Sequence, residues 1–145
     1  MIEEFQHICI TCKDLEKSIQ FYEKIGLTVT TPLLELDEAG IARAFQLPAG
    51  QLKVVHLAPP QATGKMFIDL VQWVKPPSSG VPYPTLDNVG INRLAFRVTD
   101  IEATTTSLRE RGITFLSEEP QSFGGIKTIV TTDPDGVFIQ LLEWL

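Results

Sequence analysis

The chain has 145 residues; 43% are hydrophobic, 21% are charged, and 18 acidic against 12 basic side chains give a net charge of −6. This length accommodates one compact domain, built at most of two small halves, and the composition argues against disorder. With no apolar run of about 20 residues and an acidic start, we expect neither a membrane span nor a signal peptide. The acidic balance without a basic block also excludes nucleic acid as an expected partner, and a cytoplasmic location is the default.

The first half predicts a strand, a helix and three further strands. A strand-like run at 7–11 precedes Asp14, a good helix N-cap, and an apolar stripe then continues to Gly26, which suits a left-handed helix end. The strands that follow are expected at 27–31, 51–57 and 66–73. An insertion at 33–50 includes a short helix around 37–45.

The second half repeats this pattern. His7 lies seven residues before Asp14, and Arg93 lies seven before Asp100. Twelve residues separate Asp14 from Gly26, and twelve separate Asp100 from Gly112. The ends also match, because FIDLVQW at 67–73 and FIQLLEW at 138–144 share four of seven residues. Such self-similarity predicts two copies of one structural unit.

The remaining elements of the second half follow from the repeat. Strands are expected at 113–116, 127–132 and 137–144, with the sequence Asp133-Pro134-Asp135-Gly136 as the turn before the last one. The proline-rich stretch 75–88 is predicted to link a first module at 1–74 to a second at 89–145.

Two cysteines have C-x-x-C spacing, which elsewhere signals redox chemistry or zinc. Cys9 and Cys12 lie along a predicted strand, where residues three apart point to opposite faces. Their Cα atoms would be about 10 Å apart, too far for a disulfide. Two reduced thiols are therefore favoured over a reactive pair.

Strand alternation predicts which side chains share a face. His7 and Cys9 oppose Ile8 and Ile10 on the first strand, and the last strand of that half places Phe67, Asp69, Val71 and Trp73 together. His56 shares a face with Leu52 and Val54, where a structural or rim role is favoured. A face that mixes aromatic and a few polar groups is typical of a ligand cavity.

These motifs resemble the vicinal oxygen chelate superfamily, which includes glyoxalase I, methylmalonyl-CoA epimerase, extradiol dioxygenases and bleomycin resistance proteins. The match runs from His7 through the Asp14–Gly26 segment, similar to the family's D-x-x-x-S-x-x-F-Y-x-x-x-L-G, and includes a D-P-D-G ending before the last strand. The resemblance implies an α+β fold over residues 1–145, in which tandem βαβββ modules form an incomplete eight-stranded barrel with helices outside. It also implies a homodimer, in some members with exchanged halves.

The resemblance carries the family's four metal-ligand positions to His7, Asp69, Arg93 and Gln140. Arginine cannot ligate, because its guanidinium is cationic and has no acceptor. A degenerate set of His7, Asp69 and Gln140 remains for one divalent ion, Zn²⁺, Mn²⁺, Fe²⁺ or Ni²⁺. The alternative is that no metal is bound and that Arg93 either pairs with Asp69 or holds an oxyanion as a buried arginine beside the cavity.

The implied activity depends on these residues. In the first hypothesis, His7, Asp69 and Arg93 are catalytic in an epimerase, isomerase or lyase that acts beside a carbonyl through an enolate. In the second, the protein sequesters a drug or metabolite without catalysis, as bleomycin resistance proteins do. An extradiol dioxygenase is disfavoured because Arg93 stands where its second histidine is expected. Ligand contacts are predicted for Arg93, Trp73, Tyr83, Phe123 and Gln140, with Phe123-Gly124-Gly125 either a closing loop or a hairpin bend.

Overall fold

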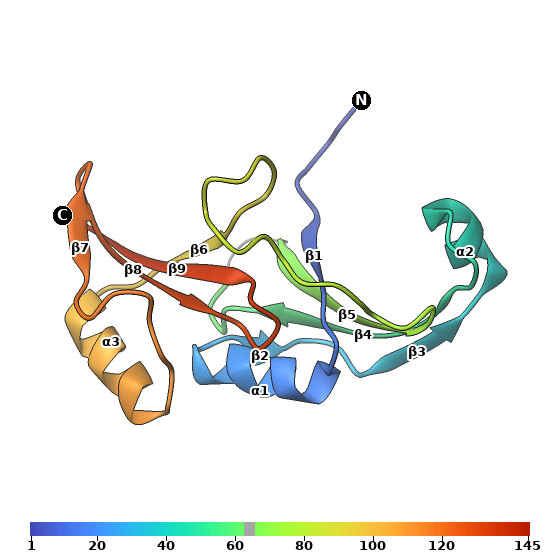
Figure 1. Ribbon diagram of the computed structural model, residues 1–145, viewed down its shortest axis with the longest axis horizontal. Coiled ribbons are helices and arrows are strands. Elements are labelled where there is room, and N and C mark those ends of the chain that lie inside the picture. Colours follow the sequence, from blue (N-terminus) through green and yellow to red (C-terminus); the bar gives the residue numbers. More distant parts are fainter. Residues whose placement is uncertain (63–65) are drawn as a thin grey trace. The chain divides into compact units, whose positions relative to one another are not determined.

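The computed structural model describes residues 1–62 and 66–145. The chain folds as two compact units, Met1–Gly80 and Val81–Leu145, so that the division falls inside the predicted linker at 75–88. Each unit is a mixed α+β structure built on one open sheet (Figure 1), which confirms the predicted fold class. In the described part of the chain, no helix has the length and apolar character needed to cross a membrane.

The first unit contains five strands and two helices. In chain order they are β1 (His7–Thr11), α1 (Leu15–Lys24), β2 (Thr28–Val29), β3 (Leu34–Asp37), α2 (Ala39–Phe45), β4 (Gln51–Ala58) and β5 (Phe67–Lys75). The sheet order is β1-β5-β4-β2, and β3 also pairs with β4. The first and last strands, β1 and β5, are parallel, whereas the other pairs are antiparallel.

Helix α1 covers one face of this sheet. It begins where the Asp14 side chain accepts a hydrogen bond from the Lys17 N–H, and it ends before Gly26, whose φ of +106° few other residues adopt. Tyr22 of the helix and Leu70 of β5 are completely buried. The Gln72 side chain of β5 also accepts a hydrogen bond from the Leu15 N–H at 2.9 Å, which fixes the helix start to the sheet.

The second unit repeats this arrangement around a four-stranded sheet of order β6-β9-β8-β7. Its elements are β6 (Leu94–Arg97), α3 (Ile101–Glu110), β7 (Gln121–Phe123), β8 (Ile126–Thr132) and β9 (Phe138–Trp144). The strands β6 and β9 are parallel, as β1 and β5 are. Asp100 caps α3 through the Ala103 N–H, and the Glu143 carboxylate accepts from the Ile101 N–H at 2.8 Å, in the position equivalent to Gln72.

Three details differ from the sequence predictions. The predicted strand at 113–116 is wrong, because only an isolated bridge joins Phe115 to Thr131. The Ile113 N–H closes the helix by donating to the Leu108 carbonyl, and strand pairing with β8 resumes only at β7, beyond Pro120. The strand expected at 27–31 is reduced to β2. The insertion at 33–50 contains β3 in addition to the expected short helix.

The helix-capping contact of Glu143 predicts a specific pattern of stability. Glu143→Leu removes the acceptor of the Ile101 N–H and a favourable charge at the helix N-terminus, so the free energy of unfolding should fall by about 1–2 kcal/mol. Glu143→Gln keeps an acceptor, as Gln72 does in the first unit, and should lose less than half as much. Urea unfolding monitored by circular dichroism measures both; equal losses in the two variants would contradict the capping role.

Candidate functional site

Parallel pairing of β1 with β5 gathers several functional side chains on the sheet face opposite α1. In the register of the strands, His7 lies beside Phe67 and Cys9 lies beside Asp69. Strand β4 then places His56 on the other side of Asp69. The predicted partners His7 and Asp69 are thus brought together, and His56 joins them.

The carboxylate of Asp69 lies between two imidazoles. Its Oδ2 is 4.0 Å from Nε2 of His7, and its Oδ1 is 3.5 Å from Nε2 of His56. The Asp69 side chain is 21% exposed, but Oδ1 itself is buried and has no hydrogen-bond partner among the described residues. Because a buried carboxylate oxygen normally accepts hydrogen bonds, this atom can take a donor or a proton from a bound molecule.

Phe67 provides an aromatic wall beside this carboxylate. Its ring stacks on the imidazole of His56 with a centroid distance of 4.1 Å and on that of His7 at 5.3 Å. The two imidazoles are 40% and 30% exposed at His7 and His56. The cluster therefore combines a flat apolar surface, one carboxylate and two imidazoles.

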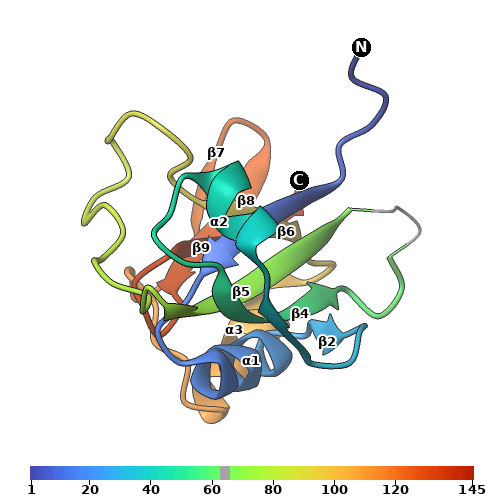
Figure 2. The ribbon, with the colours of Figure 1, turned by 90° about the vertical axis from the view of Figure 1, so that its right-hand side faces the viewer.

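The other end of the same face is apolar. Leu52, Val54 and Val71 form a buried cluster against which Trp73 packs. Helix α2 lies over this end, on the side of the sheet away from α1 (Figure 2), and its Phe45 meets the Trp73 ring edge-on at 6.1 Å. Trp73 therefore packs within the unit, and its predicted ligand contact stays a prediction.

Cys9 and Cys12 are both thiols that take part in no disulfide. Burial and, to a smaller extent, the negative charge of Asp69 together raise the pKa of the Cys9 thiol to about 11. Cys9 is consequently protonated at neutral pH, and Cys12 is buried. Both features suit the predicted pair of reduced thiols better than a nucleophile or a redox centre.

In the second unit, Arg93 is held by a chain of hydrogen bonds. Its Nε donates to Oε1 of Gln140 at 2.8 Å, and its Nη1 donates to Oδ1 of Asn92 at 3.0 Å. The Gln140 amide in turn donates to the Thr128 hydroxyl, which donates to the Leu141 carbonyl. Gln140 and Thr128 are buried, but Arg93 is exposed, so the expectation of a buried arginine is wrong. Its position before β6, beyond the pairing with β9, leaves the guanidinium outside the packed interior.

In their observed conformations, the side chains at the four predicted ligand positions do not fit a divalent metal. The Gln140 oxygen that would bind the ion accepts from Arg93, and the guanidinium places a positive charge at the fourth ligand position. Across residues 1–62 and 66–145, no group of three His, Cys, Asp or Glu side chains could hold a metal ion. The set His7, Asp69 and Gln140 stays a prediction, and no step proposed below uses a metal.

The two other predicted ligand contacts lie at the surface of the second unit. Tyr83 is exposed and lies close to Gly90. Phe123 is exposed at the end of β7, where Gly124 and Gly125 adopt positive φ angles and form the hairpin bend between β7 and β8. Their positions do not test ligand binding, so the ligand contacts of Tyr83 and Phe123 remain predictions.

His56 is the residue whose place sequence analysis underestimated. The sequence favours a structural or rim role for it, yet its Nε2 lies 3.5 Å from the Asp69 carboxylate, closer than the 4.0 Å of His7. The alternation of the predicted strand at 51–57 gave the face of His56 correctly. The missing information was the register between β4 and β5, which decides that His56 stands opposite Asp69 rather than two residues away.

Comparison with known families and structures identifies the fold and its relatives. The family model of the glyoxalase/bleomycin resistance protein/dioxygenase superfamily matches residues 4–141. The chain belongs to this superfamily. No curated protein gives a significant match.

Among solved structures, this superfamily member is similar to a glyoxalase family protein from Bacillus cereus. That structure is 20% identical with a TM-score of 0.84, and the match covers 100% of this chain and 96% of the other. A glyoxalase family protein from Enterococcus faecalis is 22% identical, with a TM-score of 0.69 and coverage of 97% and 98%. TnmS3, an antibiotic binding protein from Streptomyces sp. CB03234, is 25% identical, with a TM-score of 0.63 and coverage of 99% and 98%.

The environment of Cys9 predicts slow alkylation. In a Cys12→Ala variant, iodoacetamide should modify Cys9 at pH 8 more slowly than it modifies glutathione, by about tenfold or more, because only the thiolate reacts. Adding Asp69→Asn removes the smaller cause of the raised pKa, so the pKa should fall and the rate should increase. A rate that is unchanged or lower in the double variant would contradict the electrostatic contact between Asp69 and Cys9.

Proposed function

We propose that this protein binds a small carbonyl compound on the face that carries His7, His56, Phe67 and Asp69, and that Asp69 acts as the general base of an epimerase, isomerase or lyase. The observation that carries the proposal is the buried Oδ1 of Asp69, which has no donor among the described residues and stands beside an imidazole. A base in a partly dehydrated site, next to a second proton-exchanging group, is suited to proton transfer.

The proposed reaction needs only the side chains of this cluster to take up and return a proton. Asp69 removes a proton from the carbon next to a carbonyl, and the electron pair of that C–H bond moves into the carbonyl to form an enolate. Delivery of a proton from His7 or His56 to the opposite face of the same carbon gives the epimer, and delivery to another atom gives an isomer. In the lyase reaction, the enolate electron pair forms a carbon–carbon double bond as a β-leaving group departs with its own electron pair. Phe67 supplies a flat surface for an unsaturated substrate.

In the second unit, Arg93 is proposed to hold an anionic oxygen of a ligand bound at that unit. A guanidinium that is oriented through Nε and Nη1 retains other N–H donors for such an oxygen. A homodimer and a cytoplasmic location, both expected by analogy or by default, are parts of the same proposal.

A second candidate function is sequestration of a small molecule without catalysis. The similarity to TnmS3, described as an antibiotic binding protein, favours it. In that case the aromatic wall at Phe67 and the acceptor at Asp69 would serve binding alone, and replacing the carboxylate by an amide would alter affinity without removing any turnover.

The two functions are separated by a proton-exchange assay. The protein is incubated in D₂O with a panel of 2-oxo acids, 2-hydroxy ketones and acyl thioesters, and loss of the C–H signal beside the carbonyl is followed by proton NMR. The wild-type protein should catalyse exchange in at least one compound, and Asp69→Asn should slow it by about 10²–10⁴-fold, the usual contribution of a general base.

Asp37→Asn is the matched control, because Asp37 is an exposed carboxylate at the end of β3 in the same unit. It should exchange at the wild-type rate. Exchange that survives Asp69→Asn overturns the assignment of the base. Saturable binding of a panel member without exchange in the wild-type protein supports sequestration instead.

A further inference from the structure

The second unit has a sheet face whose charge is entirely positive. Alternation along the strands places Ala95 and Arg97 of β6, Gln140, Leu142 and Trp144 of β9, and Thr128 of β8 on the side opposite α3. The register puts Ala95 beside Gln140, and Arg97 beside Leu142. Arg93 joins this face through its hydrogen bond to Gln140.

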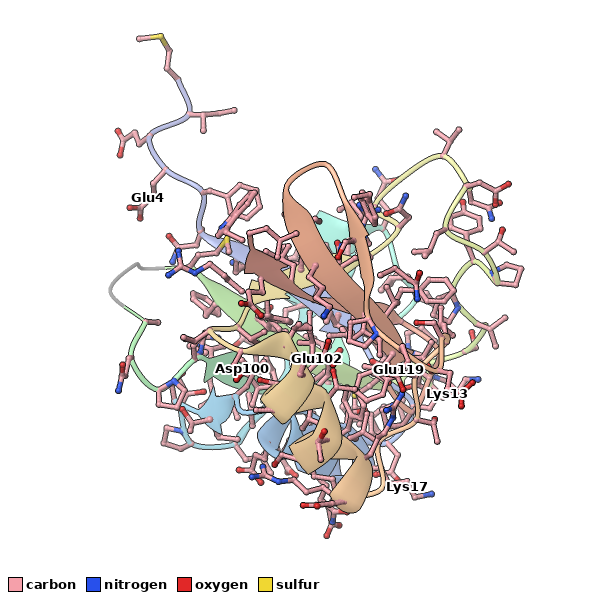
Figure 3. The ribbon with its side chains drawn as sticks, turned by 90° about the vertical axis from the view of Figure 1, so that its left-hand side faces the viewer. Glu4, Lys13, Lys17, Asp100, Glu102 and Glu119 are labelled. Atoms are coloured by element: carbon pink, nitrogen blue, oxygen red, sulfur yellow. The ribbon has the colours of Figure 1, made fainter. Side chains whose placement is uncertain are left out.

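The carboxylates of β9 and α3 lie away from this face. Glu143 points to the helix side, where its carboxylate holds the Ile101 N–H, and Glu102 of α3 pairs with Lys127. Figure 3 shows Asp100, Glu102 and Glu119 around helix α3. The second unit is described throughout, and none of the strand residues that share the face of Gln140 is acidic. A protein of net charge −6 therefore keeps one sheet face free of negative side chains.

Arg97 is the unexplained member of this face. It is exposed, and within the described residues its guanidinium has no hydrogen bond or ion pair. It lies four residues from Arg93 along an extended chain, about 13 Å between Cα atoms, a gap that two arginine side chains can close from both ends. Between them stands Ala95, whose single methyl group leaves the space above the strand open.

The rest of the face is mainly apolar. Leu142 is half-buried beside Arg97, and the indole of Trp144, next along β9, is 63% exposed. Thr128 and Gln140 are buried and already satisfied by hydrogen bonds to each other and to neighbours. An inorganic ion would gain little from such a surface, whereas an organic anion would cover the apolar side chains and reach the arginines together.

We propose that Arg97 and Arg93 form an anion-binding site on this face, which takes an organic anion with an aromatic or aliphatic body, held through a carboxylate or sulfonate group. Arg97 is the residue that gives the site its preference for a negative ligand. In Arg93, Nε and one Nη1 hydrogen already donate hydrogen bonds to Gln140 and Asn92. This inference rests on the role proposed above for Arg93 and adds Arg97 to it; the site lies within the second unit, and its test does not use proton transfer at Asp69.

The test uses two probes that differ mainly in one charged group. The full-length protein is titrated with 8-anilino-1-naphthalenesulfonate, an aromatic anion, and with N-phenyl-1-naphthylamine, which lacks the sulfonate. Arg97→Gln should weaken binding of the anionic probe by about tenfold or more, the usual effect of losing a charge-assisted hydrogen bond, and should leave binding of the neutral probe within about twofold.

Arg43→Gln is the matched control, because it removes the same charge from an exposed position in α2 of the first unit. It should bind both probes as the wild-type protein does. Arg97→Lys keeps the charge and should retain more affinity for the sulfonate than Arg97→Gln, which separates loss of charge from loss of folding. Thermal unfolding of each variant is recorded alongside.

Displacement of the anionic probe by a second anion then distinguishes an organic anion from an inorganic one as the ligand. Benzoate should displace the anionic probe at lower concentration than inorganic phosphate does. Displacement by phosphate at equal or lower concentration would overturn the requirement for an apolar body. Equal weakening of both probes in Arg97→Gln, or none, would overturn the role of Arg97, and neither result would bear on the exchange assay of Asp69.

Discussion

Parallel pairing between the first and last strands of each unit is the constraint on which the rest of the structure depends. A parallel pair requires a crossover, and in both units a helix capped by aspartate provides its first part. The crossover commits one sheet face to the helix, and the candidate functional residues lie on the other among apolar side chains. The same geometry lets Gln72 and Glu143 reach the N–H groups at the helix starts, so helix and sheet are fixed to one another in each unit.

The two copies of this frame carry different chemistry at equivalent positions. In the first unit, His7 and Asp69 give an imidazole next to a carboxylate, and His56 completes the cluster. In the second, Arg93 and Gln140 give a guanidinium hydrogen-bonded to an amide. Proton transfer suits the first pair, because a carboxylate and an imidazole can accept protons. Anion binding suits the second, because the guanidinium is cationic and has no acceptor. Duplication followed by divergence at these positions is enough to account for the difference.

Much of the frame follows from the sequence, because repetition of the Asp14–Gly26 pattern at Asp100–Gly112 marks both helices, and the parity of the strands assigns side chains to faces correctly. The strand at 113–116 was predicted wrongly because the Ile113 N–H is used to end the helix, a tertiary detail that strand propensity does not contain. The proximity of His56 to Asp69 and the exposure of Arg93 also depend on register and on where a strand stops. Neither property is visible in the residue pattern alone.

The two sheet faces differ in the charge of their functional groups: the face of the first unit contains the carboxylate of Asp69, and the face of the second contains the guanidinium groups of Arg93 and Arg97. Paramagnetic relaxation of backbone amides measures this most directly, with 4-amino-TEMPO as a cationic probe, 4-carboxy-TEMPO as an anionic probe and 4-hydroxy-TEMPO as a neutral reference. Relative to the neutral probe, the cationic probe should enhance relaxation at 67–70, and the anionic probe should enhance it at 94–97. Equal enhancement of both segments by the two charged probes would contradict the account.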